Sequence, residues 1–134
     1  MQVLTTHLAS GVPVDQVLPM PQEVRNHVAR LMLRCTIKEL FEWRFMQTDP
    51  NWGNFLFDRN TGKLSLIDFG ACREYRKSFV DGYLQLVWAA ANRDDDTILK
   101  VSKELEFLTG DETQAMMKAH VQAGLVVGEP FVDR

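Results

Sequence analysis

The sequence is poor in cysteine, and it has no long apolar run and no excess of positive charge. Its two cysteines, Cys35 and Cys72, do not have the spacing of metal ligands. Such low cysteine usage favours a reducing compartment over a disulfide framework. No stretch approaches the roughly 20 apolar residues that a membrane-spanning helix needs. With a formal net charge of −3, the chain gives no electrostatic reason to expect a nucleic-acid partner.

The remaining composition is typical of a globular protein. Of the 134 residues, 46% are hydrophobic and 25% are charged, so we expect one modest domain or a part of a larger one. No signal or transit peptide opens the chain, and its first residues resemble the interior of a domain. We therefore expect that Met1 is not the start of the natural protein.

The first half of the chain predicts one long helix and one β-hairpin. Residues 2–9 are predicted to form a short strand that leads into a loop. A helix is expected over residues 21–46; it should be buried, because it is apolar on most sides near its end, and it must stop before Pro50. Residues 55–57 and 64–67 are short apolar runs separated by the turn sequence DRNTG, which indicates a hairpin.

The second half, residues 77–128, has the apolar spacing of helices. One helix is expected from Lys77, a second from about Asp94, which can cap it, and a third from after Gly110 to about Val127. Capping and the helix dipole explain the aspartate triplet that begins at Asp94 better than a metal site does. The predicted fold class is therefore α+β, mostly helical, with one hairpin.

Three polar residues flank the predicted hairpin. The segment QTDPNWGNFLFD, residues 47–58, contains Asp49 and Asn54, and LSLIDFG ends with Asp68 in an Asp-Phe-Gly sequence. A loop aspartate, an asparagine five residues later, a hairpin and then Asp-Phe-Gly is the order used by protein-kinase-like folds. A simpler interpretation treats all three as turn and capping residues.

The chemistry of phosphoryl transfer accounts for each of these residue types. Magnesium neutralises a triphosphate and prefers hard oxygen ligands, so Asp68 is predicted to be the chelating carboxylate and Asn54 a second metal ligand. Asp49 is expected to orient or deprotonate the attacking hydroxyl group or water. Phe69 is expected to pack inward, and Gly70 to permit the backbone turn after Asp68.

The motifs QTDPNWGNFLFD, LIDFGACREY and EFLTG resemble those of the UbiB-type atypical kinase family of coenzyme Q biosynthesis, and QTDPNW is similar to its mitochondrial branch. The resemblance covers essentially the whole chain. It implies a protein-kinase-like fold that binds Mg²⁺ with ATP or ADP. By the same resemblance, Asp49 matches the catalytic-loop aspartate, Asn54 the metal-binding asparagine and Asp68 the Asp-Phe-Gly aspartate.

The resemblance also implies a biological setting. The family supports ubiquinone biosynthesis at the matrix face of the inner mitochondrial membrane. Prenyl-lipid intermediates and other proteins of coenzyme Q biosynthesis are then the expected partners, beside the nucleotide itself.

The start of the chain matches the hinge between the two lobes of a kinase. The resemblance implies that the backbone of Thr6, His7 and Leu8 meets the adenine. His7 stands where the family usually has glutamate, which should matter little because hinge contacts are made mainly by the backbone.

The N-terminal lobe is expected to be absent. The chain has no alanine-rich nucleotide loop, no phosphate-binding lysine in such a lobe and no KxGQ segment. We expect a fragment that is inactive alone, formed by a single kinase-like C-terminal lobe over residues 1–134. Its expected parts are a hinge and linker at 1–14, a buried helix at 21–46, the catalytic loop, hairpin and Asp-Phe-Gly at 47–70, and a helical subdomain at 77–128.

Three functions remain open for such a chain. The first is an ATP-dependent enzyme of coenzyme Q biosynthesis, either a kinase or an ATPase; the segment between Gly70 and Lys77 is short and lacks an APE sequence, which disfavours a protein substrate. The second is a nucleotide-gated scaffold without useful turnover. The third is a small-molecule phosphotransferase, which ranks last because it predicts His-Gly-Asp where this chain has Gln-Thr-Asp.

Overall fold

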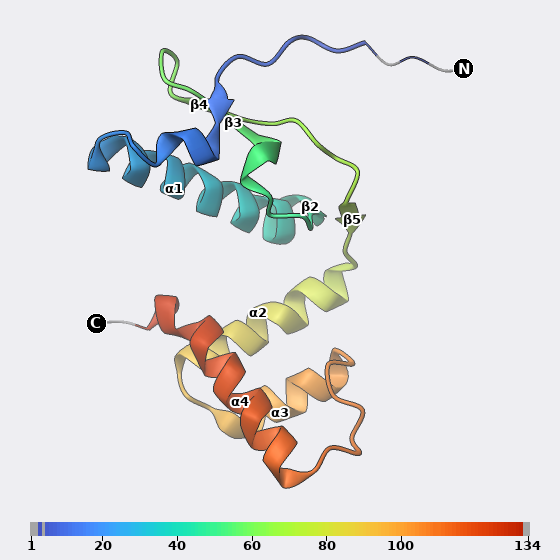
Figure 1. Ribbon diagram of the computed structural model, residues 1–134. Helices are drawn as coiled ribbons and strands as arrows, with labels where there is room; N and C mark the ends of the chain where they lie inside the picture. Colours follow the sequence, from blue (N-terminus) through green and yellow to red (C-terminus); the bar gives the residue numbers. More distant parts are fainter. Residues whose placement is uncertain (1–2, 4, 133–134) are drawn as a thin grey trace. The chain divides into compact units, whose positions relative to one another are not determined.

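The computed structural model describes residue 3 and residues 5–132, and it divides the chain into two compact units (Figure 1). Met1–Tyr75 form the N-terminal unit and Arg76–Arg134 the C-terminal unit. Within the described residues there are four α-helices and two small antiparallel sheets. The α+β class predicted from the sequence is therefore confirmed.

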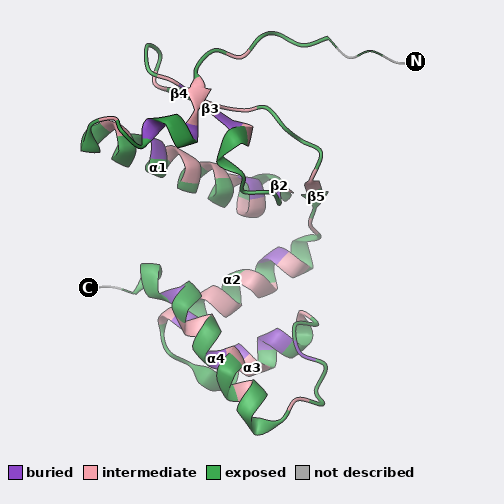
Figure 2. Cartoon of the chain, viewed as in Figure 1, coloured by how far each residue is buried: buried purple, intermediate pink, exposed green. Residues whose placement is uncertain are grey.

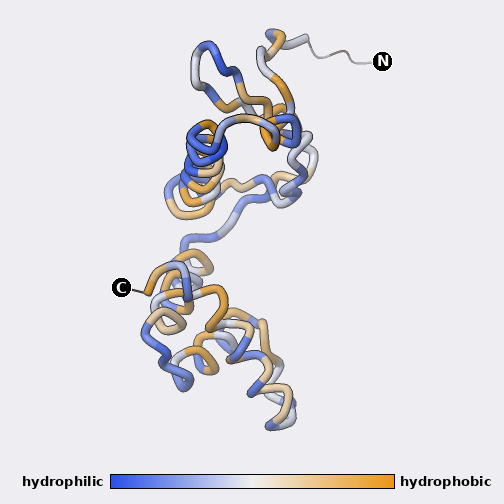
Figure 3. Tube along the Cα trace, turned by 60° about the vertical axis from the view of Figure 1, so that its left-hand side comes forward, coloured by the Kyte–Doolittle hydropathy of each residue, from blue (hydrophilic) through white to orange (hydrophobic). Residues whose placement is uncertain are grey.

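Two small sheets organise the N-terminal unit. Strands β1 (Val12–Pro13), β3 (Phe55–Asp58) and β4 (Lys63–Leu66) form the first sheet, in the order β1-β3-β4. Strand β2 (Phe45–Gln47) pairs with β5 (Cys72–Glu74) in the second. The antiparallel pairing of β3 with β4 confirms the predicted hairpin, and Figure 3 shows that its turn is hydrophilic while its strands are more apolar.

The core of the N-terminal unit lies between the first sheet and helix α1 (Gln22–Ile37), where Figure 2 shows buried residues. Phe55 and Phe57 are two residues apart on β3, so their side chains point to the same face of the sheet. Val28 is the buried residue of α1. The short 3₁₀-helix η1 (Val14–Val17) completes the core with its first and last side chains.

Helix α1 is shorter and more exposed than the sequence predicts. Leu33 and Ile37 are 59% and 39% exposed, because the small first sheet covers only one face of the helix. The helix continues as the π-helix η2 (Lys38–Trp43) and stops there rather than at residue 46. Arg44 ends it by adopting a left-handed conformation with φ 55°, and the chain then enters β2.

The strand predicted at residues 2–9 is wrong for residues 3 and 5–9, which have no regular structure, while residues 2 and 4 lie outside the described residues. Extended backbone forms a strand only where a partner offers hydrogen bonds, and β3 offers them from Val12 onward. Gly11 allows this approach: its φ is +120°, and a Cβ there would lie 2.6 Å from the carbonyl carbon of Phe57.

The C-terminal unit packs three helices, each close to its predicted position. They are α2 (Lys77–Ala91), α3 (Asp95–Glu104) and α4 (Gln114–Gly128), followed by the short 3₁₀-helix η4 (Glu129–Phe131). Asp94 caps α3 as predicted, since its carboxylate accepts hydrogen bonds from the backbone and hydroxyl of the residue three positions on. Buried side chains from all three helices form the core, namely Ala89, Ala90, Ile98 and Val121.

Two glycines of α4 face the other helices at different distances. A Cβ on Gly128 would lie 2.5 Å from the carbonyl carbon of Ala90 and 2.5 Å from the backbone nitrogen of Ala91. On Gly124 the nearest atom would be a side-chain carbon of Ile98, at 3.4 Å. The backbones of α4 and α2 therefore touch at Gly128, whereas Gly124 leaves room for a methyl group.

We expect Gly128→Ala to destabilise the fold by about 1–3 kcal/mol, because the added methyl group forces the α2 and α4 backbones apart. Gly124→Ala in the same helix is the matched control, and it should be neutral or stabilise by up to about 1 kcal/mol through helix propensity. Urea denaturation of both variants measures the difference. Equal stability of the two variants would show that the helices do not approach as closely at Gly128.

Glu112 braces the connection between α3 and α4. Its carboxylate accepts hydrogen bonds from the backbone of Thr109 at 2.7 Å, from the Thr109 hydroxyl at 2.8 Å and from the backbone of Gly110 at 2.9 Å. These bonds favour the ionised form, and those from Thr109 contribute most, so the pKa of Glu112 falls from 4.5 to about 2.

A lowered pKa in the folded state means that Glu112 contributes stability above pH 4.5, and that this contribution is lost as the pH falls toward about 2. The melting temperature of the parent should therefore drop more steeply across this window than that of Glu112→Gln, which carries no titrating group at this position. Glu104→Gln is the control, since no hydrogen bond or ion pair of its side chain occurs among the described residues. Parallel curves for the parent and Glu112→Gln would contradict the assignment.

Candidate functional site at the ends of the β3–β4 hairpin

The loop before β3 takes its shape from its own polar side chains. Oδ1 of Asp49 accepts a hydrogen bond from the backbone of Asn51 at 3.3 Å, and Oδ1 of Asn51 accepts one from the backbone of Gly53 at 3.0 Å. These are two successive turns of the kind that Asp and Asn form with the backbone two residues on. Pro50 also disfavours a helical conformation of Asp49. The loop then passes through the 3₁₀-helix η3 (Trp52–Asn54) into β3.

Asp49 and Asn54, which the sequence places five residues apart, are in direct contact. Nδ2 of Asn54 donates to Oδ2 of Asp49 at 3.2 Å. Because an ionised carboxylate can only accept, the amide nitrogen must face Asp49, and Oδ1 of Asn54 must face away from it. That oxygen has no hydrogen-bond partner among the described residues.

The two ends of the hairpin are joined through Asn54. The backbone nitrogen of Ile67, directly before Asp68, donates to the carbonyl oxygen of Asn54 at 3.0 Å. Asn54 begins the hairpin and Asp68 follows it, so this bond brings the predicted metal ligands to the same end of the two strands. The sequence interpretation predicted that both residues flank the hairpin, and the structure confirms this.

Asp68 is exposed and only partly satisfied. Its Oδ1 accepts a hydrogen bond from the backbone of Gly70 at 2.8 Å, while Oδ2 has no hydrogen-bond partner among the described residues. Gly70 does not have a positive φ; instead, a Cβ there would lie 3.2 Å from Oδ1 of Asp68, so the close approach is what favours glycine.

Phe69 does not pack inward as the sequence predicts, because its side chain is 60% exposed. The core of the N-terminal unit is filled by side chains from η1, α1 and β3, and Phe69 is not one of the residues packed against it. The prediction that Phe69 anchors the loop is therefore wrong for the structure of this chain.

Gln47 is a site residue that the sequence interpretation missed. It is 5% exposed, and its side-chain amide spans the two halves of the site. Nε2 donates to the backbone carbonyl oxygen of Asp68, and Oε1 accepts from the backbone nitrogen of Asp49 at 3.0 Å. The only signal in the sequence was a glutamine two residues before Asp49. A single glutamine is too common to be assigned a role from one sequence.

Thr48 makes a second connection beside Gln47. Its hydroxyl group donates to the carbonyl oxygen of Ala71 at 2.7 Å, and its backbone nitrogen donates to the same oxygen at 3.3 Å. The loop that carries Asp49 and the segment that follows Asp68 are therefore held together at two neighbouring points.

A buried carboxylate lies beneath these two segments. Glu39 of η2 is 5% exposed, and its Oε1 lies 3.5 Å from the backbone nitrogen of Gln47, which donates to it. Burial raises the pKa of Glu39, and the hydrogen bond from Gln47 partly opposes that rise. Burial also raises the pKa of Cys35 and of Cys72, and the charge of Glu39 adds to both shifts. A raised pKa leaves less of each thiol in the thiolate form, which is the nucleophile.

The donor set at the hairpin suits a metal held jointly with a ligand. No group of three or more His, Cys, Asp or Glu side chains that could hold a metal ion occurs among the described residues. Asn54 Oδ1 and Asp68 Oδ2 are two hard oxygens that accept no hydrogen bond from the described residues. Magnesium is commonly bound by one or two protein oxygens together with phosphate oxygens and water, so these residues fit such an ion.

The predicted adenine-binding residues do not take part in this hydrogen-bond network among the described residues. Thr6, His7 and Leu8 are exposed and have no regular structure, and Leu8 is 99% exposed. No hydrogen bond joins their side chains or backbone to other described residues. Among the described residues, no hydrogen bond therefore ties them to Asp49, Asn54 or Asp68.

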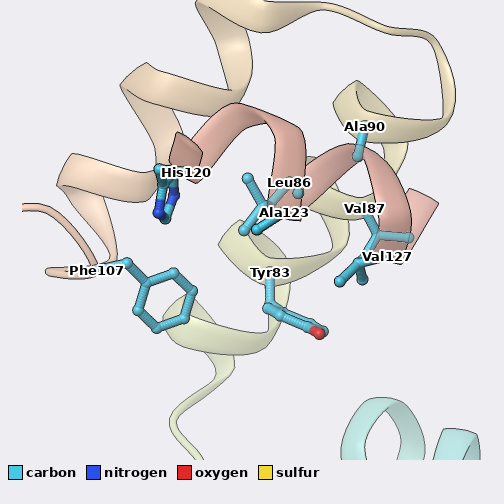
Figure 4. Close-up of a pocket in the computed structure, with 9 residues that line it drawn as sticks. Tyr83, Leu86, Val87, Ala90, Phe107, His120, Ala123 and Val127 are labelled. Atoms are coloured by element: carbon cyan, nitrogen blue, oxygen red, sulfur yellow. The ribbon is translucent and has the colours of Figure 1, made fainter. Parts of the chain in front are cut away.

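The C-terminal unit contains an apolar pocket that the sequence did not predict (Figure 4). Its volume is about 200 Å³, and none of the predicted site residues line it. One of its lining residues, His120, is hydrogen-bonded through Nε2 to the hydroxyl group of the fully buried Ser102 at 2.8 Å. The other lining residues are Tyr83, Leu86, Val87, Ala90, Phe107, Ala123, Gly124 and Val127.

None of the described helices is long and apolar enough to cross a membrane.

The order of residues at the hairpin is that of kinase-like proteins, and comparison with known proteins gives the family. Residues 1–102 match the ABC1 atypical kinase-like domain. The chain is 49% identical over 130 residues to a rat (Rattus norvegicus) protein named "Atypical kinase COQ8B, mitochondrial", covering 97% of this chain and 25% of the rat protein. The chain therefore belongs to the ABC1, or UbiB-type, family of atypical kinases.

More distant relatives carry similar names. A Danio rerio protein with the same name is 48% identical over 130 residues, which are 97% of this chain and 21% of that protein. "Atypical kinase COQ8, mitochondrial" of Saccharomyces cerevisiae is 36% identical over 129 residues, 96% of this chain and 26% of the yeast protein. The chain spans about a quarter of the length of the curated relatives it matches. Membership of a kinase-like family implies nucleotide binding.

Proposed function

We propose that this chain supplies the metal-binding half of the nucleotide site of an atypical kinase or ATPase. The observation that carries the proposal is the linked set at the hairpin: Asn54 bonded to Asp49, and both Asp49 and Asp68 bonded to Gln47. A network of turn residues alone would not require the two ends of the hairpin to be joined by a buried amide. In this proposal the chain is a kinase-like C-terminal lobe.

In this proposal Asp68 and Asn54 hold Mg²⁺ through Oδ2 and Oδ1, the oxygens that accept no hydrogen bond within the described part of the chain. When bound, the ion neutralises the charge of the phosphates. Asp49 is held by Asn54 and by the turn before Pro50, so its carboxylate is positioned to orient the attacking hydroxyl group or water and to accept its proton.

The adenine would be met by the backbone of Thr6, His7 and Leu8, which matches the hinge of the family. These residues are free of secondary structure in this chain, in keeping with a hinge whose sheet is supplied by an N-terminal lobe. A chain without the phosphate-covering lobe should be inactive alone, because the nucleotide would be held from one side only.

The biological role that we propose is support of coenzyme Q biosynthesis in mitochondria, at the matrix face of the inner membrane. The names of the relatives include the word mitochondrial, and the motif resemblance indicates coenzyme Q. Prenyl-lipid intermediates and other proteins of that biosynthesis are the proposed partners. The net charge of −3 gives no electrostatic reason to propose a nucleic-acid partner.

Asp68→Asn tests the metal assignment in the natural full-length protein. It replaces a charged oxygen ligand by a neutral amide, so magnesium-dependent binding of ATP should weaken at least about tenfold, while the melting temperature without ligand stays within a few degrees. Asp111→Asn is the matched control, an exposed loop aspartate whose carboxylate accepts no hydrogen bond among the described residues. Calorimetry with and without Mg²⁺ measures both, and unchanged affinity in Asp68→Asn would contradict the assignment.

Asp49→Asn separates an enzyme from a nucleotide-gated scaffold. If Asp49 acts on the nucleophile, its loss falls on the transition state, and turnover should drop by about 10²–10⁴-fold, or roughly 3–5 kcal/mol of barrier. Binding of ATP should remain nearly intact. The measurement combines ATP turnover with rescue of ubiquinone synthesis in cells that lack the protein.

The two readouts give distinct outcomes. Loss of turnover together with loss of rescue supports the enzyme. Loss of turnover with full rescue would identify a nucleotide-gated scaffold and would contradict the proposed catalysis. Asp111→Asn again serves as the control for removal of an exposed carboxylate.

A further inference from the structure

We propose that Gln47 is a positioning residue that sets the distance between Asp49 and Asp68, and that buried Glu39 holds Gln47 in place. The inference rests on the proposed function, because it assigns a role within the same site. It concerns a residue that touches neither metal nor nucleotide in that proposal. Gln47 acts through the backbone of the two aspartates.

The side chain of Gln47 is suited to this task by its chemistry. Its amide donates to the carbonyl oxygen of Asp68 and accepts from the backbone nitrogen of Asp49 at 3.0 Å. A carboxylate of the same length can only accept and an ammonium group can only donate, so neither could make both bonds. The two aspartates are 19 positions apart in the sequence, and Gln47 is one side chain that bonds to both.

Gln47 is itself fixed from other directions. Its backbone lies in β2, opposite Cys72 of β5, and its nitrogen donates to the carboxylate of Glu39 at 3.5 Å. Both Gln47 and Glu39 are 5% exposed, and the bond between them is buried, which limits competition from water at that bond. A support that cannot reorient is what a site needs to hold its reacting groups within a fraction of an ångström.

The π-helix explains how Glu39 reaches this position. Residues 38–43 are wound with the wider turn of a π-helix at the end of α1, and Glu39 is the buried residue of that segment. Such turns are rare and frequently occur at functional sites. A buried carboxylate within a mostly exposed helix is costly to keep, which is consistent with a role beyond packing.

The alternative is that Gln47 is merely a buried polar residue that found hydrogen bonds. In that case its loss would lower stability without changing the site in particular. Thr48 provides a way to tell these apart, because it joins the same two segments through Ala71 independently of Gln47. The strand pairing should therefore survive substitution of Gln47, and the effect should appear in the geometry of the aspartates.

The experiment compares Gln47→Glu and Gln47→Met in the natural full-length protein. Glutamate keeps an acceptor for the Asp49 backbone but loses the donor to Asp68, whereas methionine loses both bonds at similar length. Both variants should lower ATP turnover at least about tenfold and raise the Mg²⁺ concentration needed for half-maximal turnover. Gln122→Glu, an exposed residue of α4, is the matched control and should behave as the parent.

A second readout uses the protein without metal or nucleotide. Hydrogen exchange of the Asp49 backbone amide, followed by NMR, should be slow in the parent and in Gln47→Glu, where an acceptor remains. It should be at least about tenfold faster in Gln47→Met. This readout does not depend on activity, and the methionine variant keeps the test open if added charge prevents Gln47→Glu from folding.

Three results would overturn the inference. The first is parental turnover, Mg²⁺ dependence and amide exchange in both variants, which would leave the proposed function standing. The second is a loss of turnover in the variants that is proportional to their fall in melting temperature, with the same Mg²⁺ dependence as the parent. That result would make Gln47 a structural residue. The third is a parent that neither binds nor hydrolyses ATP with Mg²⁺, which would remove the proposed function as well.

Discussion

The candidate site depends on the pairing of β2 with β5. Three residues on each strand pair in an antiparallel register that sets Gln47 opposite Cys72. One strand leads directly into the loop that carries Asp49, and the other follows the segment that carries Asp68. Without this pairing the hairpin would still bring Asn54 and Asp68 together, but Asp49 would be held only by its hydrogen bond from Asn54 and by its own turn.

Short strands of this kind are weak by themselves, and the structure shows how this pair is supported. The carboxylate of Glu39 meets the end of β2 from the helical side, and Thr48 extends the ladder by bonding to Ala71. The Gln47 amide then turns the pairing into a constraint on both aspartates. A few polar hydrogen bonds, of which the one between Glu39 and Gln47 is buried, thus stabilise this short strand pair.

The sequence predicted those parts of the fold that have a strong local signal. The hairpin follows from two apolar runs around a turn, and the α3 cap follows from an aspartate placed before a helical pattern. The spacing of Asp49, Asn54 and Asp68 likewise predicted that they lie around the hairpin, whereas their roles in catalysis and metal binding stay predictions. The resemblance to the UbiB-type family, stated from the sequence, rests on these motifs, and the comparison with known proteins confirms it.

The features that the sequence did not predict depend on contacts between distant residues. β2 and β5 have three residues each, too few for a periodic pattern, and they lie more than twenty positions apart. The π-helix has no recognised sequence signal. Residue 3 and residues 5–9 pair with no described strand, and the sequence alone cannot show whether a strand finds a partner. Phe69 was expected to pack inward from its place in the Asp-Phe-Gly sequence, but burial depends on whether the surrounding residues leave space for the side chain.

In the proposed function, residues from both ends of the hairpin, Asn54 and Asp68, bind the same metal ion. The most direct test is paramagnetic relaxation by Mn²⁺ in the natural full-length protein labelled at asparagine side chains. With ADP present, Mn²⁺ should broaden the side-chain amide signal of Asn54 far more strongly than that of Asn60, which lies at the other end of the hairpin. Equal broadening at Asn60, or broadening of Asn54 that does not depend on the nucleotide, would contradict a nucleotide-linked metal site at Asn54 and Asp68.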